Sequence, residues 1–165
     1  MKNMRAIIRL CSVVLIALTL SGCGFHLRHS QADLSKKYPT IILTPSGSNT
    51  LHQGLYRALV ASSVHVVENS DIVIAPRLSV VSQELTSQPL VYGADSELRR
   101  ERLKMSVTFS FGGANAQPFE LATERDRQLN PNQHLGDNAE KIVIEREMQA
   151  DIISQLLRFI ATKPI

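Results

Sequence analysis

The most regular alternation of apolar and polar residues runs from residue 103 to residue 111. Every second position carries an apolar side chain, Leu103, Met105, Val107, Phe109 and Phe111, and the positions between them are Lys104, Ser106, Thr108 and Ser110. A period of two predicts a strand that buries one face. The following Gly112-Gly113-Ala114-Asn115 predicts a turn, and a second alternating run from Phe119 predicts an antiparallel partner strand.

Three segments in the N-terminal half also have strand character. Residues 40–44 (TIILT) lie between Pro39 and Pro45 and have the composition of a short buried strand. Residues 64–67 and 71–85 are two more candidates, and the second keeps period two through Ile72, Ile74, Leu78 and Val80. Pro76 within it predicts an edge position or a bulge, and residues 88–96 predict a hairpin connection.

Two segments instead have the 3.6-residue period of an amphipathic helix. The first spans residues 50–62, follows an N-cap candidate in residues 46–49, and aligns Leu51, Leu55, Leu59 and Val60. The second spans residues 138–162, between Asn130-Pro131 and Pro164, and its apolar positions are Val143, Met148, Ile152, Leu156, Phe159 and Ile160. Asp137 and Glu140 have the spacing of a capping box at its start.

The predicted order of elements is therefore β α β β β β α. Two helices are too few to cover both faces of a sheet. We expect one α+β domain over residues 39–165, a two-layer sandwich with two helices packed on one face of a mixed four- to five-stranded β-sheet.

The first 22 residues have the pattern of an export signal. Lys2, Arg5 and Arg9 precede the apolar run Leu10–Leu20, which is too short for a membrane-spanning helix of about 20 residues. The following Leu20-Ser21-Gly22-Cys23 resembles the lipobox of bacterial lipoproteins. That resemblance implies cleavage before Cys23, a diacylglycerol on its sulfur and an acyl chain such as palmitate on its new amino group. A plain signal peptide with an incidental cysteine is the alternative.

On this hypothesis the chain divides into a cleaved signal peptide (1–22), a lipidated N-terminus and polar tether (23–38), and the domain. Gly24 stands where an inner-membrane retention signal typically has Asp, so the resemblance implies an outer-membrane lipoprotein facing the periplasm. The only cysteines are Cys11, which would be removed, and Cys23, which would become a thioether. The mature chain would then contain no disulfide.

The net charge of +3 and the pI near 9.1 suggest nucleic acid or an anionic surface as a partner. However, the three bases before residue 23 account for the whole excess, and residues 23–165 carry 15 bases and 15 acids. A neutral mature chain does not predict a nucleic-acid partner.

Motifs for catalysis and metal binding are missing from the sequence. Cys23, His26 and His29 have C-x-x-H-x-x-H spacing, but lipidation of Cys23 would remove the thiolate, so no metal and no cofactor is expected. The other histidines, His52, His65 and His134, are scattered, and Glu120 and Glu124 share a strand face without a recognisable pocket. We predict no catalytic residues and no enzyme activity.

The remaining charged feature is the cluster Arg99, Arg100, Arg102 and Lys104 at the start of the most regular strand. If that strand begins near Glu97, Arg100, Arg102 and Lys104 share its polar face at intervals of about 6.6–6.8 Å. Such a row suits multivalent phosphorylated anions. The alternative, favoured by residue types alone, is a solvated face that Glu97 and Glu101 partly neutralise and that blocks edge pairing.

The run Cys23-Gly24-Phe25-His26-Leu27-Arg28 resembles the mature start of the LPS-assembly lipoprotein family LptE, and the order of elements, Asn130-Pro131 and the pair Glu147-Met148 fit its layout. The resemblance implies a non-enzymatic outer-membrane lipoprotein that binds lipopolysaccharide and plugs the large β-barrel LptD as a heterodimer. It favours Arg99, Arg100, Arg102 and Lys104 as lipopolysaccharide contacts. Residues 134–138 contain no Lys or Arg, so a second contact there is not expected.

The leading hypothesis is thus a barrel plug that assists assembly of lipopolysaccharide into the outer leaflet. The main alternative is a structural envelope lipoprotein that scaffolds a barrel or another assembly without binding lipid. A membrane-anchored periplasmic hydrolase is a third and weaker alternative, since the sequence shows no nucleophile with an adjacent base.

Overall fold

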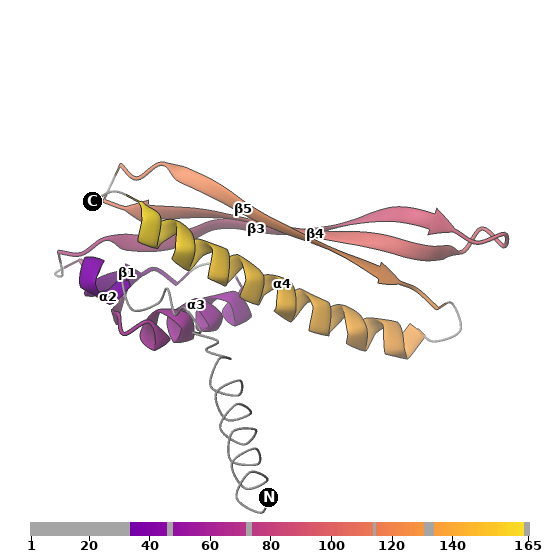
Figure 1. The fold of residues 1–165 in the computed structure, drawn as a ribbon, viewed down its shortest axis with the longest axis horizontal. Helices are drawn as coiled ribbons and strands as arrows, with labels where there is room; N and C mark the ends of the chain where they lie inside the picture. Colours follow the sequence, from indigo (N-terminus) through magenta and orange to yellow (C-terminus); the bar gives the residue numbers. More distant parts are fainter. Residues whose placement is uncertain (1–33, 46–47, 72–73, 114, 131–133, 164–165) are drawn as a thin grey trace, which may run out of the picture.

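Five strands form one mixed sheet in the order β2-β1-β3-β4-β5 (Figure 1). Their bounds are β1 (Thr40–Leu43), β2 (His65–Glu68), β3 (Arg77–Tyr92), β4 (Leu98–Gly112) and β5 (Pro118–Gln128). Strand β1 is parallel to β2 and β3, and β3, β4 and β5 are successively antiparallel. The structure is a computed structural model that describes residues 34–45, 48–71, 74–113, 115–130 and 134–163.

Three helices lie on one side of this sheet: α2 (Leu34–Lys37), α3 (Asn49–Ala61) and α4 (His134–Thr162) (Figure 1). The α+β class, the mixed sheet and the packing of helices on one face are confirmed. The one-turn helix α2 was not predicted.

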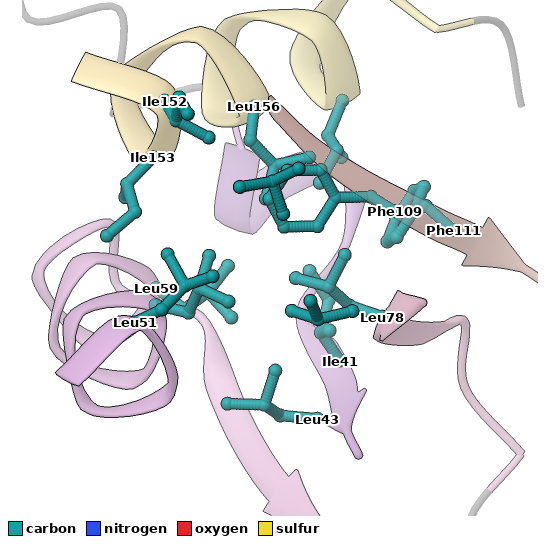
Figure 2. Close-up of a cluster of buried hydrophobic side chains, with 14 of the residues drawn as sticks. Ile41, Leu43, Leu51, Leu59, Leu78, Phe109, Phe111, Ile152, Ile153 and Leu156 are labelled. Atoms are coloured by element: carbon teal, nitrogen blue, oxygen red, sulfur yellow. The ribbon is translucent and has the colours of Figure 1, made fainter. Parts of the chain in front are cut away.

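Strand β4 supplies the central part of the core. The five apolar side chains of its alternating run are all buried, and Val107 and Phe109 are fully inaccessible. They face leucines and isoleucines from both long helices, as Figure 2 shows for Leu51, Leu59, Ile152 and Leu156. The predicted one-sided strand is confirmed, and its partner β5 pairs with it antiparallel as expected.

Helix α3 begins at Asn49, one residue before the predicted start at residue 50. The Ser48 side chain accepts a hydrogen bond from the Leu51 amide at 3.3 Å, which satisfies one free donor of the first turn. Leu51, Leu55 and Leu59 are fully buried, whereas Val60 is 48% exposed. Including Val60 in the buried stripe was wrong, because nine residues at 100° each place it opposite Leu51 on the helix.

Helix α4 begins at His134, so Asp137 lies inside it and the predicted start at residue 138 with a capping box was wrong. Its buried stripe contains Met148, Ile152, Leu156 and Ile160. Val143 is 50% exposed because α4 extends past the first turn of α3, where Gln149 contacts Thr50 (Figure 1). Phe159 is 38% exposed and rests at the edge of the core, with its ring centroid 4.2 Å from that of Phe119.

Strand β3 lies later in the chain than the predicted 71–85. It starts after Pro76, whose carbonyl accepts a hydrogen bond from the Ile42 amide at 2.9 Å, so this proline marks the entry of a central strand and not an edge. The strand continues to Tyr92, so the connection to β4 consists of residues 93–97 and not of the predicted residues 88–96. A register shift beside Pro89 accommodates the proline where β3 pairs with β4 alone.

The folded part of the chain begins earlier than predicted. Leu34 is 1% exposed and belongs to the core, and Tyr38 packs edge-on against Phe111 with ring centroids 5.1 Å apart. The Lys37 ammonium donates a hydrogen bond to the Ala161 carbonyl at 2.9 Å and another to the Lys163 carbonyl. Residues 34–38, expected to be tether, are therefore packed against the end of α4. The predicted signal peptide and residues 23–33 lie outside the described residues.

Candidate functional site

The basic cluster lies on β4 near the tip of the long β3–β4 hairpin. Glu101, Leu103 and Met105 point into the layer of helices, so the alternation of the strand directs Arg100, Arg102 and Lys104 to the opposite face. All three helices lie on the other side of the sheet (Figure 1). The outer face of β4 therefore presents these three bases in a row.

Two of the three bases share one carboxylate on the neighbouring strand. Arg102 lies opposite Asp126 of β5 and donates to it from Nε at 2.7 Å and from Nη2 at 3.2 Å. Arg100 donates to the same carboxylate from Nη2 at 3.0 Å. The hydrogen bond from Arg102, together with the charges of both arginines, lowers the pKa of Asp126. Glu124 stands 3.7 Å from the Arg102 guanidinium and adds a second negative charge.

Lys104 and Arg99 differ from this pair. Lys104 is exposed, lies opposite Glu124 in β5 and Thr86 in β3, and belongs to none of the salt bridges found among the described residues. Because successive side chains of a strand point to opposite faces, Arg99 lies on the other face of β4 from Arg100. It forms an ion pair with Asp95 in the turn before β4. The structure thus groups Arg100, Arg102 and Lys104, and separates Arg99 from them.

A buried ion pair on the helix side of the same strands was not visible in the sequence. Glu101 and Arg127 face each other across β4 and β5, with the Arg127 Nε 2.5 Å from the Glu101 Oε1, and their side chains are 10% and 8% exposed. Burial works to raise the pKa of Glu101, but hydrogen bonds from Ser87 and Arg127 outweigh it and hold that pKa below its usual value. Only the register of the strands identifies the pair.

The other candidates do not assemble into a catalytic or metal site. His52 contacts Glu68 at 3.3 Å beside an open cavity of about 310 Å³, and His65 is exposed on β2. Glu120 and Glu124 are exposed on the outer face of β5. The described part of the chain contains no group of three side chains suited to a metal ion. Cys23, His26 and His29 lie outside it.

Comparison with known proteins identifies the family. A family model described as LptE, lipopolysaccharide-assembly, matches residues 38–160. The chain belongs to the LptE family. It is also similar to the LPS-assembly lipoprotein LptE of Pectobacterium atrosepticum, with 25% identity over 151 residues that cover 90% of this chain and 82% of that protein. The family predicted from the opening motif is therefore confirmed.

Solved structures of lipoproteins share the fold. Rare lipoprotein B of Shewanella oneidensis has a TM-score of 0.66 at 21% identity and covers 74% of this chain and 94% of its own. A minor lipoprotein of Acinetobacter baumannii has a TM-score of 0.61 at 24% identity and covers 75% of this chain and 91% of its own. Lipoprotein B of Nitrosomonas europaea has a TM-score of 0.64 at 21% identity, with coverage of 82% and 88%.

These findings assign the chain to a family of envelope lipoproteins with a role in lipopolysaccharide assembly, which is not an enzyme family. Among the described helices, none combines the length and the apolar character needed to cross a membrane.

Proposed function

We propose that this chain is an outer-membrane lipoprotein, anchored through lipidated Cys23, that binds lipopolysaccharide and plugs the β-barrel LptD from its periplasmic side. In this role it would assist delivery of lipopolysaccharide to the outer leaflet. Membership of the LptE family supports the general role. The observation that carries the proposal is the row of three bases on the face of β4 that the helices leave open.

The geometry of this row fits a ligand with several phosphates. Each guanidinium has five N–H donors, and Asp126 accepts one from Arg100 and two from Arg102. The side chains of these arginines remain 50% and 41% exposed, so donors stay available for phosphate oxygens. Asp126 also limits the rotamers of both arginines and thereby orders this part of the row before a ligand binds.

The same acids give the scaffold alternative its best support. Asp126 and Glu124 offset the charge of the arginines, so a row used only to hold β4 against β5 would look similar. The two functions differ in what happens when the bases are removed.

The test compares two double variants of the purified mature lipoprotein. Arg102→Gln with Lys104→Gln removes two charges from the row, and Arg57→Gln with Arg146→Gln removes two exposed charges from α3 and α4. We expect the first variant to lower lipopolysaccharide affinity about tenfold and to flatten its salt dependence, and the second to leave both unchanged. Equal affinity in both variants would eliminate the proposed site.

A single variant is expected to change the lipopolysaccharide affinity in the opposite direction. Asp126→Asn removes the carboxylate that competes with phosphate for both arginines and preserves the shape of the side chain. Under the proposal this variant binds lipopolysaccharide more tightly than the unsubstituted chain. Under the scaffold alternative, neither protein binds it.

The barrel partner is tested separately. Affinity capture of the lipidated chain from outer membranes should recover one large barrel protein in equal amount. Recovery of the chain without a barrel protein would refute the plug role, whatever the lipopolysaccharide measurements show.

A further inference from the structure

Strand β5 forms an open edge of the sheet (Figure 1). Within the described part of the chain, β4 is the only strand that pairs with it. It has 11 residues, whereas β2 at the opposite edge has four. The unpaired side of an edge strand carries backbone donors and acceptors that can pair with another extended chain. Of the two edges, β5 therefore offers the longer one to an added strand.

The register shows which residues of β5 direct their backbone groups to the open side. The Leu129 amide donates to the Arg99 carbonyl at 2.9 Å, and this pair continues the register in which Arg100 faces Gln128. Because hydrogen-bonded pairs alternate with non-bonded pairs in an antiparallel ladder, the odd-numbered residues of β5 bond to β4 and the even-numbered residues face the open side. The residues with an amide on that side are Glu120, Ala122, Glu124, Asp126 and Gln128.

Side chains of β5 itself protect the second half of this edge. The Arg125 guanidinium donates to the Glu124 carbonyl at 2.9 Å, so this acceptor on the open side is already occupied. Arg125 and Arg127 also point toward the helices, and inward-pointing charges are a common protection of edge strands. In residues 118–123 the inward side chains are instead uncharged: Phe119, Leu121 and Thr123. Strand addition is therefore favoured at residues 118–123.

This first half has an apolar margin on the helix side. Phe119 and Leu121 are only partly buried, and Phe159 of α4 is 38% exposed with its ring centroid 4.2 Å from that of Phe119. An added strand would place every second side chain beside this margin. Apolar side chains at those positions would bury surface of both partners and so add to the backbone hydrogen bonds.

The outer face of the same stretch carries one charge. Glu120 is exposed, lies opposite the uncharged Thr108 of β4, and forms no salt bridge with any other described residue. A Lys or Arg directly opposite it on an added strand would form a favourable cross-strand pair. A second copy of β5 would not supply that base, because the charged residues on its outer face are all acids: Glu120, Glu124 and Asp126.

We propose that residues 118–123 of β5 accept an extended segment of a different protein as a sixth strand of the sheet. The segment pairs antiparallel to β5, which is the more stable arrangement. Its side chains alternate between apolar residues on the helix side and polar residues on the outer side, with Lys or Arg opposite Glu120. This inference goes beyond the proposed function and depends neither on lipid anchoring nor on lipopolysaccharide.

The test uses a fluorophore-labelled synthetic peptide with this pattern, Gly-Val-Thr-Val-Lys-Val-Thr-Gly. One version has N-methyl groups on its three valines, whose amides would point away from β5. The other has them on both threonines and the lysine, whose amides would point toward β5. We expect the first version to bind the purified mature lipoprotein at least tenfold more tightly, measured by fluorescence anisotropy, since the second loses its donors to the edge.

Variants of the chain locate the peptide on β5. Glu120→Lys should weaken binding of the valine-methylated peptide about fivefold, and a peptide with Glu in place of its Lys should bind this variant better than the original chain. The control Glu84→Lys makes the same charge change on the outer face of β3 and should leave both affinities unchanged. Ala122→Pro removes one amide from the open side and none from the ladder with β4, so it should also weaken binding about fivefold.

Four results would overturn the proposal. The first is no change in anisotropy with either peptide, and the second is equal affinity of the two methylated versions, which would mean that the backbone does not pair. The third is an equal effect of Glu120→Lys and Glu84→Lys, which would assign binding to the general charge of the face. The fourth is a dimer of the chain that Ala122→Pro dissociates, which would assign the edge to a second copy. The exchange of charge between Glu120 and the peptide keeps the test valid if Ala122→Pro fails to fold.

Discussion

Replacing Glu101 by Gln should destabilise the domain more than the loss of any exposed ion pair. The carboxylate is held by Arg127 and Ser87 between three strands, and both partners of the ion pair are about nine-tenths buried. Gln keeps the size of the side chain but leaves the guanidinium charge of Arg127 in a poorly solvated site, which costs about 3–5 kcal/mol. With a urea m-value of about 2 kcal/mol/M, this corresponds to a fall in the unfolding midpoint of about 1.5–2.5 M.

Two further variants test whether the cost of Glu101→Gln comes from leaving a buried charge without its partner. Asp151→Asn breaks the half-exposed ion pair with Arg125, and it should cost less than about 1 kcal/mol. Glu101→Leu with Arg127→Met replaces the buried pair by apolar side chains of similar size, and stability should return to within about 1 kcal/mol of the unsubstituted chain. The reasoning is wrong if Glu101→Gln and Asp151→Asn have the same midpoint, or if the apolar double variant is the least stable.

The remaining predictions concern the core, a helix cap and pH. Leu55→Ala should lower the free energy of unfolding by about 2–5 kcal/mol in urea, since the side chain is fully buried between sheet and helices. Ser48→Ala should cost about 1 kcal/mol in the same assay, since it removes the acceptor for the Leu51 amide. The pKa values of Glu101 and Asp126 are lowered in the folded state, so their stabilisation is present above their unfolded pKa values of about 4 and is lost as pH falls through the lower folded values. The urea midpoint should therefore fall between pH 5 and pH 2, and by less in Glu101→Gln.

Local periodicity was sufficient for β4 and for the buried stripe of α3, which supply a large part of the core. The alternation from Leu103 to Phe111 predicted both the strand and its buried face, because every second side chain enters one continuous apolar layer. The buried leucines of α3 were likewise visible, since a short helix with one apolar stripe has a single way to pack, whereas its cap was predicted only as one of residues 46–49. The arrangement of Arg100, Arg102 and Lys104 on one face follows from the same alternation.

Features set by pairing between distant segments could not be predicted. Whether Arg100 and Arg102 share Asp126, and whether Glu101 meets Arg127, depends on the register of β4 against β5. The start of β3 depends on β1, which pairs with the first two residues of β3. Because of this pairing, Pro76 stands at the entry of an interior strand. The packing of α2 depends on the far end of the chain, since Lys37 binds carbonyls more than 120 residues away.

The contact between Lys37 and the end of α4 also means that the described fold starts and finishes at one place. Domains with adjacent ends tolerate circular permutation when the new ends open an exposed turn. Here a short linker could join Lys163 to Leu34, and the turn at residues 93–96 could be opened instead. If the chain is anchored through Cys23 as proposed, a permuted chain anchored instead at that turn would place the opposite end of the domain next to the membrane while its internal contacts are preserved.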